Sequence, residues 1–315
     1  MRFGVMAAGG VGAYFGGLLA RAGEDVRFIA RGAHLEAIRR GGLRVEAVVP
    51  EGGFAVKDPF ATDDPAGAGV CDVVLFCVKT TANEAAIPAI APMMGPDSVV
   101  ISLQNGVDNE DRLAARYGRE RVMGGAAYIF TSVAGPGLIR QIGGPRRFVF
   151  GELGGGASAR GERILAVLKN ARINAELSAD IEAELWTKFI FICGVSGMTA
   201  LTRSPLGEIM AYEGTRRMMR GVMREVYEVG RARGVRLPQG ADEDRFRFLD
   251  QQNPASKGSL CHDLEAGRRL EIDALCGALS RLGREAGVAT PLNDFIYHTL
   301  KLADLQIAGE VKLKE

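Results

Sequence analysis

Short apolar runs alternate with helical patterns along the first half of the chain. The runs cover residues 3–6, 26–30, 73–78 and 99–103. They are apolar at nearly every position, which is typical of strands buried on both faces of a parallel sheet. Helical periodicity follows each run, over residues 14–21, 33–39, 83–93 and 109–117. This alternation predicts an α/β fold with a Rossmann-type doubly wound sheet.

The pattern becomes β-rich over residues 121–153. Gly and Pro separate the apolar segments there, as in AGPGLI and IGGPRRFVFGEL, which predicts hairpins that extend the sheet. A short helix is expected next, over residues 157–169.

The last part of the chain is helical in composition. Ser178 is the expected N-cap of its first helix. Long helices are predicted over residues 179–201, 214–233 and 271–286. The sequence therefore predicts two domains, a cofactor-binding Rossmann domain over 1–177 and an all-helical domain over 178–315.

The composition is that of a soluble globular protein. Hydrophobic residues make up 47% of the 315 residues, and acids and bases nearly balance at a formal net charge of +1. This balance gives no charge-based reason to expect nucleic acid or a membrane surface as a partner. The apolar run 189–195 is shorter than a membrane span, and no secretory signal is seen before the first strand. We expect a cytoplasmic protein whose apolar C-terminal helices could bury a homodimer interface.

The cysteines and histidines are scattered along the sequence. The cysteines form no CxxC pair and have apolar neighbours, so reduced core residues are expected. The histidines lie too far apart for a metal-ligand pattern, and no metal is predicted. These residues are Cys71, Cys77, Cys193, Cys261, Cys276, His34, His262 and His298.

The stretch AAGGVG lies where a dinucleotide-binding loop is expected. It follows the first predicted strand and opens the first helix, so backbone N–H groups and the helix dipole would meet a pyrophosphate. Gly9 lets the backbone approach the phosphates, and Gly12 lets the helix pack closely on the strand. Ala7 replaces the first glycine of G-x-G-x-x-G and is tolerated if its φ is negative. The expected cofactor contacts are Ala7, Ala8, Gly9, Gly10, Val11 and Gly12. An ordinary strand-to-helix turn is the alternative.

The second predicted strand ends in FIARG. Arg31 therefore stands where an NAD-preferring site usually offers an acidic side chain to the ribose. An arginine there can instead pair with the 2′-phosphate of NADP(H). The alternative is a solvated surface arginine.

Several motifs give the chain a resemblance to a known family. The stretch MAAGGVGAYFGGLLARAGEDVRFIARGAHLEAIRRGGLRV resembles the N-terminus of the ketopantoate reductase (2-dehydropantoate 2-reductase) family. FCVKTTAN, ISLQNGVDN, ELWTK and SLCHDLEAGRRLEIDAL follow in the family's order and span nearly the whole chain. The resemblance implies NADPH-dependent reduction of a 2-keto acid, with a Rossmann domain, a helical domain and an active site in the cleft between them.

The resemblance also implies roles for particular residues. The lysine that contacts the cofactor falls on Lys79, and the cleft asparagine, near cofactor and substrate, falls on Asn105. The catalytic lysine falls on Lys188. The substrate-binding serine falls on Ser259, and the glutamate, catalytic and close to the cofactor, falls on Glu271. Lys79 and Asn105 both end predicted strands at the carboxyl edge where α/β sheets bind ligands. An exposed loop lysine and an Asn-Gly turn are the alternatives.

Lys188 suits the proton transfer that reduction of a carbonyl requires. Hydride delivery leaves negative charge on the oxygen, and an acid must stand there. The apolar helix LWTKFIFICGVSGM should disfavour the ammonium form of Lys188 and ease loss of its proton. Ile192 and Ser196, where the family often has asparagines, continue the same helix face as a pocket wall with Ser196 in polar contact with the substrate. A lysine that snorkels from a buried helix is the alternative.

Ser259 and Glu271 pose a problem of distance. Twelve residues of unbroken helix would separate them by about 18 Å. Gly267 in LEAGRRLE can cap one short helix and let the chain turn before the next begins near Leu270. The alternatives are a plain N-cap for Ser259 and a solvated first-turn acid for Glu271.

The sequence therefore predicts an NADPH-dependent reductase whose substrate is a small 2-keto acid, with ketopantoate as the first candidate. Ile192 removes a hydrogen-bonding group from the predicted pocket wall, so a family member that reduces a more apolar keto acid is the second candidate. A non-catalytic NADP(H)-binding sensor would need no Lys188. A dehydrogenase of a phosphorylated polyol would need more cations than that helix face supplies.

Overall fold

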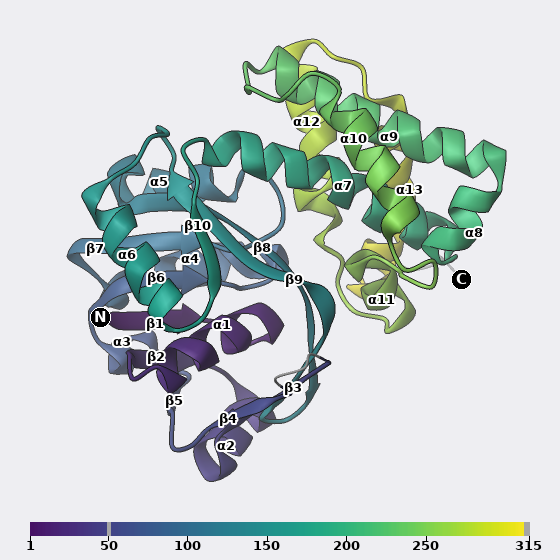
Figure 1. Ribbon diagram of the computed structural model, residues 1–315. Helices are drawn as coiled ribbons and strands as arrows, with labels where there is room; N and C mark the ends of the chain where they lie inside the picture. Colours follow the sequence, from purple (N-terminus) through teal and green to yellow (C-terminus); the bar gives the residue numbers. More distant parts are fainter. Residues whose placement is uncertain (49–51, 312–315) are drawn as a thin grey trace. The chain divides into compact units, whose positions relative to one another are not determined.

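The computed structural model describes residues 1–48 and 52–311. The chain divides into two compact units, drawn in Figure 1. Unit 1 contains residues 1–104 and 109–181, and unit 2 contains residues 105–108 and 182–315. The boundary thus lies near residue 181, and the short segment 105–108 groups with unit 2.

Unit 1 is built on one mixed sheet. In the described part of the chain, ten strands pair in the order β4-β3-β9-β8-β7-β6-β1-β2-β5, with β10 beside β9. All pairs from β8 to β5 in this order are parallel, and β8–β9 and β3–β4 are antiparallel. The strands are β1 (Arg2–Met6), β2 (Asp25–Ile29), β3 (Leu43–Ala47), β4 (Phe54–Val56), β5 (Phe60–Thr62), β6 (Cys71–Phe76), β7 (Met94–Ser102), β8 (Val122–Gly135), β9 (Leu138–Glu152) and β10 (Asn174–Leu177).

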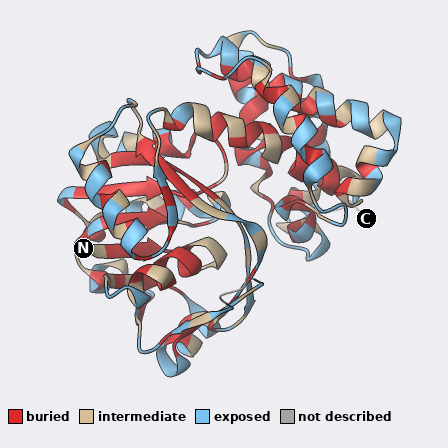
Figure 2. Ribbon diagram, in the orientation of Figure 1, coloured by how far each residue is buried: buried red, intermediate tan, exposed pale blue. Residues whose placement is uncertain are grey.

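Helices cover both faces of this sheet. Successive side chains of a strand point to opposite faces. Phe3 and Val5 of β1 accordingly join one apolar core, while Met6 joins a second core with Val74 and Phe76 of β6. The first core includes residues of α1, α2 and α6, and the second includes residues of α3, α4 and α5. Their bounds are α1 (Gly10–Arg21), α2 (Gly32–Gly41), α3 (Pro65–Ala68), α4 (Asn83–Ala89), α5 (Asn109–Tyr117) and α6 (Ala159–Asn170). The predicted doubly wound α/β sheet is confirmed, and Figure 2 shows its strands buried.

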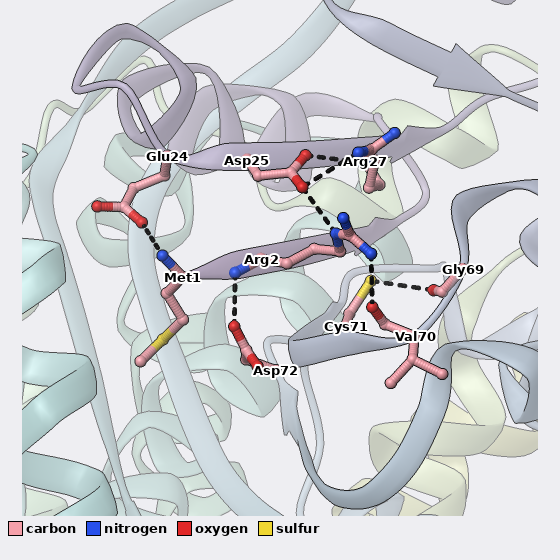
Figure 3. A network of polar contacts seen from close by, with 9 residues as sticks. All are labelled: Met1, Arg2, Glu24, Asp25, Arg27, Gly69, Val70, Cys71 and Asp72. Atoms are coloured by element: carbon pink, nitrogen blue, oxygen red, sulfur yellow. Dashed lines mark hydrogen bonds and ion pairs between the residues drawn. The ribbon is translucent and has the colours of Figure 1, made fainter.

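Charged side chains tie together the amino ends of β1, β2 and β6 (Figure 3). Asp25 accepts hydrogen bonds from Arg2 Nε at 2.7 Å and from Arg27 Nη2 at 3.1 Å. The backbone N–H of Arg2 donates to Asp72 at 2.7 Å. The hydrogen bond from Arg27 is the main cause that lowers the pKa of Asp25, assisted by the bond from Arg2. This edge is held by salt bridges, while the carboxyl ends of the same strands lead into the loops of the predicted site.

Unit 2 is helical and has its own apolar core. Its longest helix is α7, and core side chains such as Phe189, Ile190 and Met198 come from it. By length and composition α7 could cross a membrane, but 67% of its apolar window is buried inside the protein, as in the core helix of a globular unit. The helices are α7 (Ile181–Thr202), α8 (Leu206–Ala211), α9 (Glu213–Ala232), α10 (Ala241–Phe248), α11 (Ser259–Glu265), α12 (Cys276–Ala286) and α13 (Pro291–Ile307).

Two helix boundaries differ from the prediction. Ser178 is not an N-cap, because α7 begins at Ile181 and the Ser178 hydroxyl accepts from the Asp180 N–H at 3.1 Å. The helix expected over 271–286 is broken, because Leu275 has φ −107° and ψ −105°. A 3-10 turn, η5 (Glu271–Ala274), precedes this residue, and α12 follows it.

The cysteines lie in apolar surroundings. All five are free thiols, and four of them are buried. Burial raises the pKa of Cys71 to about 11 and that of Cys77 to about 12. A raised pKa keeps a thiol protonated, and a protonated thiol is a poor nucleophile. This agrees with the expected role of these cysteines in the core.

Candidate active site

The glycine-rich loop joins β1 to α1. A Cβ atom on Gly12 would lie 2.3 Å from the Ala7 carbonyl oxygen and 2.8 Å from Val5 Cγ1. Close packing of α1 on β1 therefore requires glycine at this position. Gly9 is the N-cap of α1, no described side chain caps the helix there, and a Cβ on Gly9 would meet nothing within 4 Å. Open space and helix N–H groups without helical partners fit the pyrophosphate of a dinucleotide.

Ala7 has a different backbone conformation from the one expected. Its φ is +76°, so the negative φ under which alanine was expected to be tolerated is not found. A left-handed alanine is strained by about 1–3 kcal/mol and persists only where neighbouring contacts fix it. The carbonyl of Met6 accepts from the Cys77 N–H at 2.9 Å, and the N–H of Ala8 donates to Ile29 at 2.8 Å. The loop thus keeps the tight turn of a glycine without the glycine.

Arg31 lies beside this loop. It is the N-cap of α2, two residues after β2 ends at Ile29, whose carbonyl receives the Ala8 N–H. The Arg31 side chain is exposed and makes no hydrogen bond or ion pair with residues 1–48 and 52–311. A cation placed at this strand end fits the 2′-phosphate of NADP(H).

Buried amides hold the loops after β6 and β7. Gln104 Nε2 donates to the Val78 carbonyl at 2.8 Å and to Asn83 Oδ1 at 2.7 Å. Asn83 in turn donates to Asn109 at 3.1 Å. Lys79 is exposed directly after Val78. The network therefore fixes the backbone from which Lys79 extends.

Asn105 follows Gln104 and is half-buried. It begins the segment 105–108 that belongs to unit 2. At the end of this segment, Asp108 accepts a hydrogen bond from Arg281 Nη2 of α12 at 2.7 Å. Val107 packs against the apolar core of unit 2. Both contacts anchor the backbone of Asn105.

Lys188, Ile192 and Ser196 share one face of α7, as their spacing predicts. The Lys188 side chain is buried, with 9% of the residue exposed, among neighbours on α7 that belong to the core. Ser196 is 5% exposed, and Ile192 is half-buried. A lysine in such surroundings is desolvated and suited to proton transfer.

Ser259 lies close to this helix face through Gly258. A Cβ on Gly258 would be 2.5 Å from Ser196 Cα, so the chain before α11 packs directly on α7. The Gly258 N–H donates to Thr199 Oγ1 at 3.0 Å. Gly258, and not Ser259, is the N-cap of α11, and Ser259 is exposed at the first helical position. The structure therefore brings Ser196 and Ser259 into one neighbourhood.

Gly267 ends α11 as predicted. Its φ is +61°. The Gly267 N–H donates to Leu264 at 3.1 Å and the Arg268 N–H to Asp263 at 2.8 Å, which is the Schellman pattern of a helix end. Glu271 then opens η5 and is half-buried.

Asp304 of α13 anchors the backbone just before Glu271. Its carboxylate accepts from the Leu270 N–H and from Arg269 Nε, each at 2.8 Å. Burial raises the pKa of Asp304, but the bonds from Arg269 and Leu270 outweigh burial and leave this pKa below its usual value. Leu270 is the N-cap of η5, so Asp304 fixes the backbone at the start of η5, where Glu271 lies.

Sequence reasoning did not identify Gln104, Asn83, Gly258 or Asp304. Gln104 gave a signal, because an amide in the run ISLQN directly follows a buried strand. Asp304 gave none, since its partners lie 34 and 35 residues earlier.

The fold and the glycine-rich loop define the class of protein. A doubly wound sheet, a glycine-rich loop that opens the first helix and an arginine just after β2 are typical of a dinucleotide-dependent oxidoreductase.

Comparisons with known proteins identify the family. The profile of ketopantoate reductase PanE/ApbA matches residues 3–155, and the profile of its C-terminal part matches residues 180–304. The chain belongs to the ketopantoate reductase family. It is accordingly an oxidoreductase that acts on a CH–OH group with a nicotinamide cofactor.

Individual relatives agree with this assignment. A 2-dehydropantoate 2-reductase of Mesorhizobium japonicum is 34% identical over 94% of this chain and 95% of its own length. The crystal structure of a PanE/ApbA family ketopantoate reductase from Ralstonia eutropha JMP134 has a TM-score of 0.89 and 35% identity over 98% of this chain and all of that one. A D-mandelate dehydrogenase with NADH shares the fold, with a TM-score of 0.88 at 22% identity over 98% of this chain and all of that one.

Proposed function

We propose that the protein reduces 2-dehydropantoate to pantoate with NADPH, in the cytoplasm, and that Lys188 is the general acid. The observation that carries this proposal is the burial of Lys188 on the core helix α7, in the region that matches the C-terminal part of the family. A sensor that only bound cofactor would have no use for a desolvated lysine in this position.

Each predicted residue has a part in this reaction. The cofactor supplies the hydride. Lys188 donates a proton to the substrate oxygen as negative charge develops on it. Glu271 orients the hydroxyl of the bound acid and lies near the cofactor. Asn105, Ser196 and Ser259 supply further polar contacts to the substrate.

Most of the cofactor contacts in this proposal come from unit 1, and Asn105 of unit 2 adds one more. The loop from Ala7 to Gly12 receives the pyrophosphate, and Lys79 and Asn105 contact the cofactor from the ends of β6 and β7. Arg31 pairs with the 2′-phosphate, which favours NADPH over NADH. The exposed guanidinium of Arg31 supports this preference.

Ile192 favours a second candidate substrate class, a more apolar 2-keto acid. It stands one helical turn after Lys188, where the resemblance places an asparagine, and it is half-buried against the apolar core of unit 2. A mandelate dehydrogenase with the same fold shows that this architecture can serve an acid with an aromatic ring.

The homodimer expected from the sequence stays a prediction.

The decisive experiment measures NADPH oxidation with a panel of 2-keto acids. The panel contains 2-dehydropantoate, its analogue without the hydroxyl group, and an aryl keto acid such as benzoylformate. We expect 2-dehydropantoate to have the highest kcat/KM of the three acids. Turnover of the aryl acid alone would select the second candidate, and NADPH binding without turnover of any acid would point to a sensor.

A further inference from the structure

The imidazole of His34 connects the glycine-rich loop to the β8–β9 hairpin. Its Nε2 atom lies 2.8 Å from the Ala8 carbonyl oxygen, and the Gly137 N–H donates to its Nδ1 atom at 3.0 Å. A carbonyl oxygen only accepts and a backbone N–H only donates. Nε2 therefore carries the proton and Nδ1 the lone pair, so both nitrogens of a neutral ring are used.

The hairpin is itself fixed on α2. A Cβ on Gly137 would lie 3.1 Å from Ala37 Cβ, and the Gly137 carbonyl accepts from the Arg44 N–H at 2.9 Å. The hairpin also covers the start of α1, because a Cβ on Gly10 would lie 2.6 Å from Thr131 Oγ1. His34 thus links the loop to a rigid support.

The peptide that His34 holds carries the Gly9 N–H, which in the proposed function donates a hydrogen bond to the cofactor pyrophosphate. The Ala8 carbonyl and the Gly9 N–H belong to the same planar trans peptide, so a bond to the carbonyl fixes the direction of the N–H. Gly9 is the N-cap of α1. The N–H of Ala8 is already bound to Ile29 at 2.8 Å. Without His34, only one of the two polar groups of Ala8 would be held, next to the strained Ala7.

We propose that His34 is a positioning residue for cofactor binding, which orients the Ala8–Gly9 peptide toward the cofactor pyrophosphate through the Nε2–H bond. This inference rests on the proposed function of the loop. Both ring nitrogens of His34 are bonded within the protein, so His34 acts through the Ala8–Gly9 peptide.

Two amide substitutions separate the two bonds of the ring. In His34→Gln, the amide nitrogen takes the place of Nε2 and keeps the bond to Ala8. In His34→Asn, the shorter amide places its oxygen at Nδ1, so it keeps the bond to Gly137 and loses the bond to Ala8. The exposed His298 of α13 provides the control His298→Asn.

The experiment measures the Kd of NADPH and the Kd of adenosine 2′-monophosphate by titration of the full-length variants. We expect His34→Asn to weaken NADPH binding about tenfold, the lower end of the effect of one hydrogen bond to a charged group, because the Gly9 N–H is misdirected and not removed. We expect His34→Gln to stay within about threefold of the unmutated protein and His298→Asn to change nothing. Adenosine 2′-monophosphate has no pyrophosphate, so its affinity should be the same in all four proteins, and kcat at saturating NADPH should not change.

Three results would overturn the inference. The first is an unchanged Kd of NADPH in His34→Asn, and the second is a loss of NADPH affinity in His34→Gln as large as that in His34→Asn. The third is a loss of affinity for adenosine 2′-monophosphate in parallel with that for NADPH, which would mean that α2 as a whole has moved. Failure of the unmutated protein to bind NADPH would remove the proposed function as well, whereas these three results leave it intact.

Discussion

The two units present the proposed functional groups in different ways. In unit 1 the groups are backbone N–H groups of the Ala7–Gly12 loop and the exposed side chain of Arg31, all within one strand-helix-strand segment. In unit 2 they are side chains on three separate elements, and Lys188 is buried. An anion can be bound by exposed donors, because many N–H groups act together at a helix N-terminus. Burial disfavours the charged form of a lysine and so eases loss of its proton, which an exposed lysine would not gain.

The glycine-rich loop of unit 1 and Glu271 of unit 2 are also held in place by different kinds of contact. The glycine loop is held by backbone bonds to the neighbouring strands, such as the Ala8–Ile29 bond. Glu271 depends on Asp304, which reaches it from another helix through Leu270 and Arg269. The conformation of the glycine-rich loop thus depends on neighbouring strands of one sheet, whereas the position of Glu271, a proposed catalytic group, depends on the packed helical unit.

The largest expected effect is that of Lys188→Ala on turnover. Loss of a positioned general acid should lower kcat by about two to four orders of magnitude. The Kd of NADPH should stay unchanged, because Lys188 is not among the proposed cofactor contacts. Steady-state kinetics and NADPH titration check both quantities, with the exposed Lys169→Ala as control. A kcat equal to that of the control would assign the proton to another group.

Asp304→Ala should affect stability and the acid limit of unit 2. We expect a loss of about 2–4 kcal/mol in the free energy of unfolding at pH 7, below the value for a fully enclosed pair because the Arg269 side chain is 45% exposed. The folded-state pKa of Asp304 is lowered, so its ionised form stabilises the protein above the usual pKa of about 3.9, and this contribution is lost as the pH falls through the folded-state pKa.

Urea unfolding at pH 7 and at pH 3 measures this contribution. The difference between the unmutated protein and Asp304→Ala should shrink at the lower pH, while the exposed Asp250→Ala should lose little at either. A difference that grows on acidification would contradict the lowered pKa of Asp304.

Arg31→Ala should weaken NADPH binding by about 1.5–3 kcal/mol, or about 10- to 150-fold in Kd, because a charge-assisted pair to phosphate is lost. NADH binding should change less than threefold. Arg40→Ala, at the opposite end of α2, is the matched control. Equal affinity of the unmutated protein for both cofactors would exclude a 2′-phosphate contact of Arg31.

Ile192→Asn should give the smallest effect. An amide in the pocket wall should raise kcat/KM for 2-dehydropantoate relative to its analogue without the hydroxyl by roughly 1 kcal/mol, about fivefold. The measurement is a competition between both substrates under identical NADPH. An equal response of the two substrates would show that Ile192 does not face the substrate, and the second candidate substrate class would lose its support.

The sequence alone determined the α/β class and most central elements. The helix α5 has the predicted bounds, Asn109–Tyr117, and β1, β2, β6 and β7 lie where the apolar runs predict them. Most residues of these strands are buried, and α5 keeps its apolar residues on one face, so both patterns are local properties of the chain. Gly267 is of the same kind, because only its own backbone freedom is needed to end α11.

Short edge strands and the supports of the site were decided by the tertiary structure. The strands β3, β4, β5 and β10 have three to five residues each, and β3, β5 and β10 depend on pairing with β9 or β2, which lie far from them in the sequence. The positive φ of Ala7 likewise goes with contacts outside its own segment, because its neighbours Met6 and Ala8 bond to Cys77 and Ile29. Local sequence sets the preference of a backbone for helix or strand by fractions of a kcal/mol per residue, and packing and long-range hydrogen bonds are strong enough to override it.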